Sequence, residues 1–186
     1  METSLWPRRL DEALIAPNAT NGERLLSYGA AILGAGFAAV LAITAGLPWW
    51  TTIVLTLMGF DLFGGVVVNA TPSGSRRFHS VGRPRWAELG FVAGHVHPLL
   101  LAVLTPAMPW STAAVTYGGI VLASALIVLS GALRQASAFA LAALLLAPLV
   151  SIIPTEPVVA WVAPLLVIKL LLSHLLPHAP SAKPLT

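Results

Sequence analysis

The chain contains no cysteine among its 186 residues. This absence excludes disulfides, thiol nucleophiles, cysteine-ligated zinc and iron–sulfur clusters. Charge is also scarce, because only 9% of the residues are Asp, Glu, Lys or Arg, against about 25% in a soluble domain. With 57% hydrophobic residues and a mean hydropathy of +0.86, the chain cannot cover a water-facing surface. A lipid bilayer is therefore its expected main partner.

The few charges do not indicate a nucleic-acid-binding protein. The formal net charge is +3 and the sequence pI is about 10.0, but the basic residues are too few and too dispersed to form a phosphate-binding patch. Their positions fit orientation in a membrane better. We therefore expect no nucleic-acid partner.

Six apolar runs are each long enough to cross a bilayer, at about 18–23 residues. The sequence therefore predicts an all-α polytopic membrane protein, a six-transmembrane-helix bundle over residues 25–176. The predicted spans are 25–47, 49–70, 87–104, 111–133, 136–153 and 158–176.

The loops between these runs predict the topology. Every basic residue outside the runs falls on one side, namely Arg8, Arg9, Arg24, Arg76, Arg77, Arg83, Arg85, Arg134 and Lys183. The positive-inside rule makes that side cytoplasmic, so both termini are expected inside. Tryptophans fall at the opposite ends, as an aromatic belt requires: Trp49, Trp50, Trp110 and Trp161. The expected location is a bacterial cytoplasmic (inner) membrane.

Two short segments flank the bundle. Residues 1–24 are expected to form a cytoplasmic N-terminal segment, and residues 177–186 a cytoplasmic tail. The stretch 7–15 predicts a short helix on the membrane surface, with a disordered tail as the alternative. Thr20 and Glu23 have the spacing of a capping box at the start of the first span.

An aspartate, Asp61, lies near the middle of the second predicted span. A buried aspartate must be paired, protonated or bound to a metal. The candidate partner is Lys169, at similar depth in the sixth span, and the alternative is a neutral acid that donates to a backbone carbonyl. Asn69 lies two turns from Asp61, roughly on the same side of the helix.

Two histidines and a proline interrupt the third predicted span. His95 and His97 lie roughly 12–15 Å into it. Pro98 lacks an N–H and leaves the Gly94 carbonyl without its helical partner, which predicts a kink. Residues two apart on one helix point roughly 200° apart. Either the kink re-aims both histidines, or only one of them serves a central site.

The connection 71–86 is the longest and most basic. Its simplest interpretation is a loop that orients the protein. The functional interpretation is a lid in which Arg76 and Arg77 bind an anionic lipid or an amphipathic substrate. His79 would reach from this loop to the mouth of the bundle.

Polar residues from spans two, three and six are expected to converge in the cytoplasmic half of the bundle. The first hypothesis is a metal-dependent membrane enzyme that acts on a lipid-like or amphipathic substrate. A divalent transition metal (zinc, iron or copper) would be held by His95, His97, His174 and His79. Asp61 and Lys169 would be catalytic, while Asn69, Arg76 and Arg77 would bind substrate.

Other functions stay open, and whether the chain is an enzyme is not decided by the sequence. A small proton-coupled carrier or channel would use Asp61 and the histidines to move protons. A b-type haem protein would need axial histidines from spans three and six, which are offset in depth. A structural assembly subunit would use the same residues only to bind helices together. Formation of a homo-oligomer also stays open.

Overall fold

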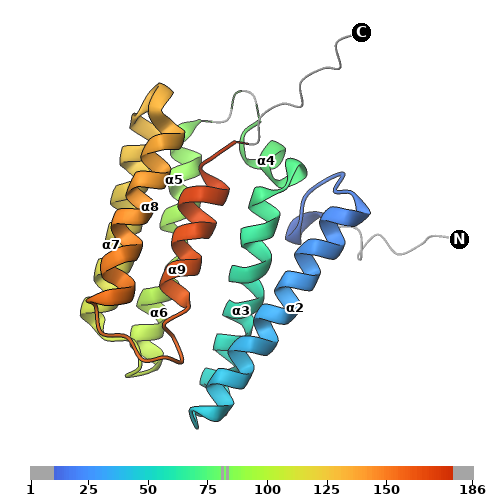
Figure 1. The fold of residues 1–186 in the computed structure, drawn as a ribbon. Helices are drawn as coiled ribbons and strands as arrows, with labels where there is room; N and C mark the ends of the chain where they lie inside the picture. The colour runs from blue at the N-terminus through green and yellow to red at the C-terminus, as the bar shows by residue number, and fades with distance from the viewer. Residues whose placement is uncertain (1–10, 81, 83, 178–186) are drawn as a thin grey trace, which may run out of the picture.

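The computed structural model describes residues 11–80, 82 and 84–177. All regular structure in this part of the chain is helical, which agrees with the predicted all-α class (Figure 1). The elements in chain order are α2 (Asn21–Thr44), α3 (Trp49–Ala70), α4 (Pro72–Phe78), α5 (Arg85–Ala93), α6 (His97–Leu104), α7 (Trp110–Leu129), the 3-10 turn η1 (Gly131–Leu133), α8 (Arg134–Ser151), α9 (Val162–Val167) and the π-helical segment η2 (Ile168–His174).

Five helical stretches are long and apolar enough to cross a membrane within the described residues. They are α2, α3, the α5–α6 pair, α7, and η1 with α8. The last predicted span contains a shorter apolar helix, Val162–His174, that is preceded by a series of turns. The chain thus has the character of a helical membrane protein.

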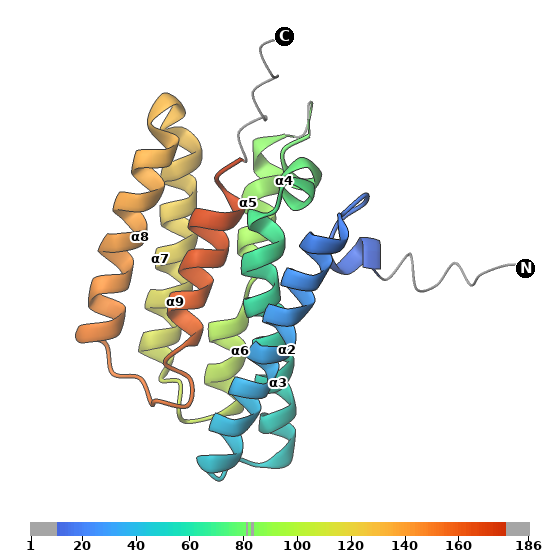
Figure 2. The same cartoon turned by 45° about the vertical axis from the view of Figure 1, so that its right-hand side comes forward.

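The helices form a bundle with two distinct ends (Figures 1 and 2). The start of α2, the short helix α4 and the turn between α7 and α8 lie at one end. The α2–α3 and α6–α7 connections lie at the other, where the side chains of Trp49 and Trp110 are 75% and 60% exposed. The arginines of α2, α4 and α8 therefore lie at one end, and Trp49, Trp50 and Trp110 lie at the other, as the loop pattern predicts. Trp86, at the start of α5, is an exception because it lies at the basic end.

Helices α2 and α3 pair along their whole length at one side of the bundle. The shorter helix α9 and segment η2 lie between α3 and α8 (Figure 2). The apolar core is built mainly of leucine, valine, isoleucine and alanine side chains from α3, α6, α7, α8, α9 and η2.

The described part of the N-terminal segment folds back onto the bundle. Thr20 and Glu23 form the predicted capping box at the start of α2. Residues 11–14 are helical, and Ile15 and Ala16 are fully buried, with exposures of 1% and 0%. The start of the predicted surface helix, at residues 7–10, lies outside the described residues, as does most of the predicted tail.

Candidate functional site

A break in the third apolar stretch brings two histidines together. Helix α5 ends at Ala93 and α6 begins at His97, with Pro98 in its first turn. Because proline cannot donate to the preceding turn, the α-helix does not continue through this point. The rings of His95 and His97 lie 5.3 Å apart, with their planes at 34°. The predicted kink is confirmed, and it re-aims both histidines.

The π-helical segment η2 aligns Lys169 and His174. In an α-helix, residues five apart lie roughly 140° apart around the axis. A π-helix instead bonds residues five apart, as the Leu175 N–H to Leu170 carbonyl bond of 3.2 Å shows here. Both polar side chains consequently turn into the bundle, where the residues are 2% and 1% exposed.

An ion pair joins α3 to this segment. The Lys169 ammonium lies 2.6 Å from Asp61 Oδ2 and also donates to the Asp61 backbone carbonyl at 3.2 Å. His97 Nε2 lies 3.4 Å from the same carboxylate oxygen. The pairing of Asp61 with Lys169, predicted from their depth, is confirmed. We call Asp61, Lys169, His95 and His97 the central cluster.

The two partners of this ion pair differ in exposure. The Lys169 side chain is 3% exposed, whereas that of Asp61 is 49% exposed. Gly65 leaves the room that the lysine occupies, since a Cβ there would lie 2.4 Å from Lys169 Cε. Asn69 donates to the Lys169 carbonyl over a long 3.4 Å. The ammonium is thus enclosed, while the carboxylate remains accessible.

The carboxylate oxygens of Asp61 also differ from each other. Oδ2 contacts both the Lys169 ammonium and His97 Nε2, while Oδ1 has no hydrogen-bond partner among the described residues. His95 Nδ1 lies 2.7 Å from the Phe91 carbonyl and must carry the hydrogen, because a carbonyl only accepts. His97 Nδ1 is buried without a partner in the described chain. A hydrogen on His97 Nε2 fits these surroundings, because Nε2 then points a donor at Asp61 Oδ2.

A second polar group lies at the end of the bundle where the basic residues gather. His79 Nε2 donates to the His174 carbonyl at 2.8 Å, so the loop histidine reaches the bundle as predicted. His79 Nδ1 lies 3.4 Å from Glu88, which also pairs with Arg134. Arg134 in turn donates to the Leu175 carbonyl at 2.8 Å. We call His79, Glu88, Arg134 and His174 the end cluster.

Phe91 separates these two clusters. Its ring stacks on His174 at 4.1 Å between centroids and lies 4.6 Å from the ring of His95. The four histidines within the described residues therefore form two pairs, one on each side of an apolar ring.

This arrangement does not support the predicted metal centre formed by His95, His97, His174 and His79. No group of three or more histidine, aspartate or glutamate side chains within the described ranges is placed to hold a metal ion. The nearby carboxylate, Asp61, is already engaged by the Lys169 ammonium.

A pocket of about 420 Å³ opens beside the central cluster. It lies between α2, α3, α4, α5, η2 and the N-terminal segment. Its lining combines aromatic rings with a few polar groups. The lining residues are Ala13, Leu14, Ile15, Ser27, Tyr28, Ala31, Phe60, Asp61, Gly64, Gly65, Val68, Asn69, Arg77, Phe78, Phe91 and Lys169.

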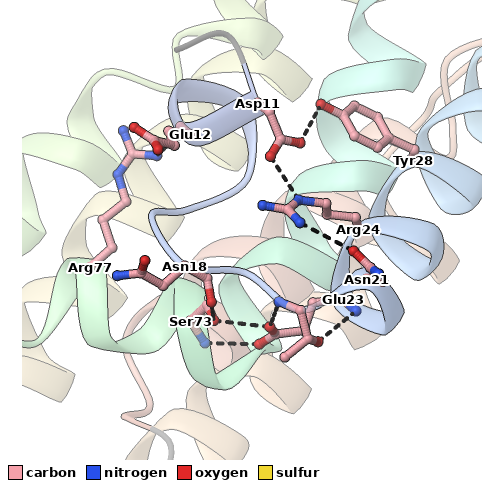
Figure 3. Close-up of polar contacts among 10 residues, drawn as sticks. Asp11, Glu12, Asn18, Asn21, Glu23, Arg24, Tyr28, Ser73 and Arg77 are labelled. Atoms are coloured by element: carbon pink, nitrogen blue, oxygen red, sulfur yellow. Dashed lines mark hydrogen bonds and ion pairs between the residues drawn. The ribbon is translucent and has the colours of Figure 1, made fainter. Parts of the chain in front are cut away.

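The N-terminal segment lines one side of this pocket, and polar contacts hold it in place (Figure 3). Arg77 donates to the backbone carbonyls of Glu12 and Ala13 at 3.1 and 2.9 Å. Asp11 accepts from Arg24 at 2.7 Å and from the Tyr28 hydroxyl at 3.2 Å. The segment is therefore held from α4 on one side and from α2 on the other.

Glu23 connects the same two helices (Figure 3). Its carboxylate accepts from the backbone N–H and the hydroxyl of Ser73, at 3.0 and 2.9 Å, in the first turn of α4. It also accepts from the Thr20 backbone N–H at 2.6 Å. These three hydrogen bonds tie the start of α2 to the first turn of α4.

Only one of the two predicted loop arginines borders the pocket. Arg77 lines it, whereas Arg76 donates to Ser73 Oγ at 2.8 Å and is not among the lining residues. The sequence prediction missed Glu88 and Phe91, because nothing in their local pattern indicates which helix they face.

The described fold is that of a helical membrane protein in which an ion pair and two histidines meet among apolar helices. No family model, curated protein or solved structure matches the chain.

Proposed function

We propose that this chain is a small proton-coupled carrier in which Asp61 binds the transported solute or the proton. One observation carries the proposal. A carboxylate in the middle of an apolar helix is half exposed to a pocket, while its lysine partner is enclosed. Ionisable groups in such positions are costly and mark ion or proton pathways in membrane proteins.

Two irregular helices beside Asp61 support a carrier. The α5–α6 break and the π-helical segment η2 both contribute to the central cluster. Carriers commonly build their binding sites from interrupted helices, whose freed backbone groups line a cavity. A π-helical turn within a helix is likewise frequent at functional sites.

A carrier fits the site better than the metal-dependent enzyme does. A metal site needs several ligands around one point, but Phe91 lies between the two histidine pairs. Proton exchange needs only titratable groups in contact, and Asp61, Lys169 and His97 provide them.

The proposed topology has six crossings, with the short helix Val162–His174 and its flanking turns as the sixth. The end that carries Arg24, Arg77 and Arg134 then faces the cytoplasm, by the positive-inside rule. Both termini would lie inside, in a bacterial inner membrane. The pocket would open in the cytoplasmic half.

The test uses purified protein in liposomes that contain a pH-sensitive dye. Organic cations, organic anions, sugars and alkali salts are added outside in turn, and the internal pH is followed. We expect at least one class to change the internal pH with wild-type protein, and Asp61→Asn to reduce the rate to that of empty vesicles. Glu156→Gln, which changes an exposed carboxylate at the opposite end of the bundle, should keep the wild-type rate.

Two results would contradict the carrier. One is the absence of any protein-dependent pH change across all four classes. The other is an Asp61→Asn rate equal to that of the wild type. Stoichiometric zinc, iron or copper by elemental analysis, lost in His95→Ala, would instead support the enzyme.

A further inference from the structure

We infer that the pocket binds a monovalent organic ammonium ion, and that this ion displaces the proton of Lys169, so that cation and proton exchange one for one. The inference rests on the proposed carrier function and names its substrate class and stoichiometry.

The charged group that a ligand meets first is the carboxylate. Asp61 is 49% exposed and its Oδ1 has no partner in the described chain, while Lys169 is 3% exposed and points its ammonium at Oδ2. An anionic ligand would have to reach an enclosed ammonium past the carboxylate. A cation reaches Oδ1 directly.

The lining suits an organic cation. Aromatic rings from four helices border the pocket, namely Tyr28, Phe60, Phe78 and Phe91. The faces of such rings attract cations, and they recognise quaternary ammonium groups in particular. The volume of about 420 Å³ lies within the range of small-molecule sites. A bare metal ion would instead need several oxygen ligands.

The other charges around Lys169 favour a single positive charge on the ligand. Asp61 faces the Lys169 ammonium from α3, and His95 and His97 lie beside this ion pair at the α5–α6 break. Arg77 from α4 also borders the pocket, with its guanidinium bonded to backbone carbonyls. Asp61 is the only acidic side chain in the described lining, so a divalent cation would leave excess positive charge.

The need to keep the charges around Asp61 balanced also explains why a bound cation would release a proton from Lys169. At rest, the Asp61 carboxylate and the Lys169 ammonium are together neutral. An ammonium ion at Oδ1 would add a second cation to one carboxylate in apolar surroundings, which is costly. Loss of one proton from Lys169 Nζ to water restores neutrality and leaves a neutral amine. No covalent bond forms to the ligand, and no electron is transferred.

The first test counts protons. Benzyltrimethylammonium is titrated into the purified full-length protein by calorimetry, in buffers with different heats of ionisation. This probe has no titratable proton, so every proton released comes from the protein. We expect about one proton released for each cation bound. Binding without proton release, or no binding, would overturn the inference, and neither result depends on a variant that must fold.

Variants separate the two halves of the exchange. Asp61→Asn should weaken binding by about thirty-fold or more, as when one partner of a desolvated charge pair is removed. Lys169→Gln should still bind the probe but release no proton, which a merely structural role for the lysine does not explain. Glu156→Gln should behave as wild type. Benzenesulfonate, an anion of similar size, should not bind; if it binds in place of the cation, the inference fails.

The liposome experiment shows which proposal has failed. If organic anions or sugars, but not benzyltrimethylammonium, drive an Asp61-dependent pH change, the carrier stands and the substrate class is wrong. If no solute class moves protons, both proposals fail.

Discussion

Helix α3 packs against α2 on one face and against η2 on another. The first interface is a close contact between backbones, whereas the second encloses a lysine side chain. Toward α2, glycines bring the backbones together: a Cβ on Gly59 would lie 2.4 Å from the Gly34 carbonyl oxygen. Toward η2, Gly65 leaves room for a side chain, because a Cβ there would meet Lys169 Cε at 2.4 Å. We call these the dry interface and the polar interface.

The comparison shows that glycine serves two purposes within one helix. At the dry interface it permits the close approach that holds apolar helices together in lipid, where hydrophobic burial does not drive helix association. At the polar interface it accommodates a cation and its flexible stem. The same Gly→Ala change should therefore affect stability at one interface and proton coupling at the other.

Gly59→Ala should cause the largest loss of stability. The new methyl group meets backbone, which can only move if the whole helix shifts, so we expect the free energy of unfolding to fall by about 1–3 kcal/mol. Denaturation in detergent measures it. Gly36→Ala is the matched control, because a Cβ there meets nothing within 4 Å. Equal stability of the two variants would contradict the close backbone contact.

Gly65→Ala should have a smaller effect on stability, about 1 kcal/mol, because the end of the Lys169 side chain can move away. That movement lengthens the 2.6 Å contact with Asp61. We therefore expect solute-driven proton movement in liposomes to fall more, per folded molecule, than it does in Gly59→Ala. The distinction between the interfaces is wrong if the two variants lose activity equally.

Asn69→Ala should have the smallest effect. Its hydrogen bond to the Lys169 carbonyl is long, at 3.4 Å, and such a bond contributes about 0.5 kcal/mol or less. We expect a change in proton movement of about two-fold at most, measured in the same liposomes. A loss as large as that of Gly65→Ala would mean that the amide takes part in solute binding.

The sequence predicted those features of the site that depend on depth and on local chemistry. Asp61 and Lys169 were expected at one level of the membrane and form an ion pair. Pro98 predicted the break that turns His95 and His97 toward each other. Both inferences need only a position along a helix and the missing N–H of proline.

Features that depend on rotation about each helix axis were not predicted. The histidines were expected to meet in one site, but Phe91 lies between the two pairs. The contact of Glu88 with Arg134 joins α5 to α8, and a single sequence does not indicate which helices are neighbours. The fold of residues 11–20 against α2 and α4 depends on the same lateral arrangement.

The π-helical segment η2 has a consequence for insertions and deletions. In an α-helix with one residue fewer, Lys169 and His174 would be four positions apart, roughly 40° around the axis. Segment η2 therefore corresponds to an α-helix with one inserted residue. The π-helical geometry accommodates this residue, so that Lys169 and His174 still lie on the same side of the helix. Deleting one of Leu170, Leu171 and Leu172 should restore the α-helix and keep both side chains facing inward, whereas a deletion before Lys169 would rotate them relative to Trp161.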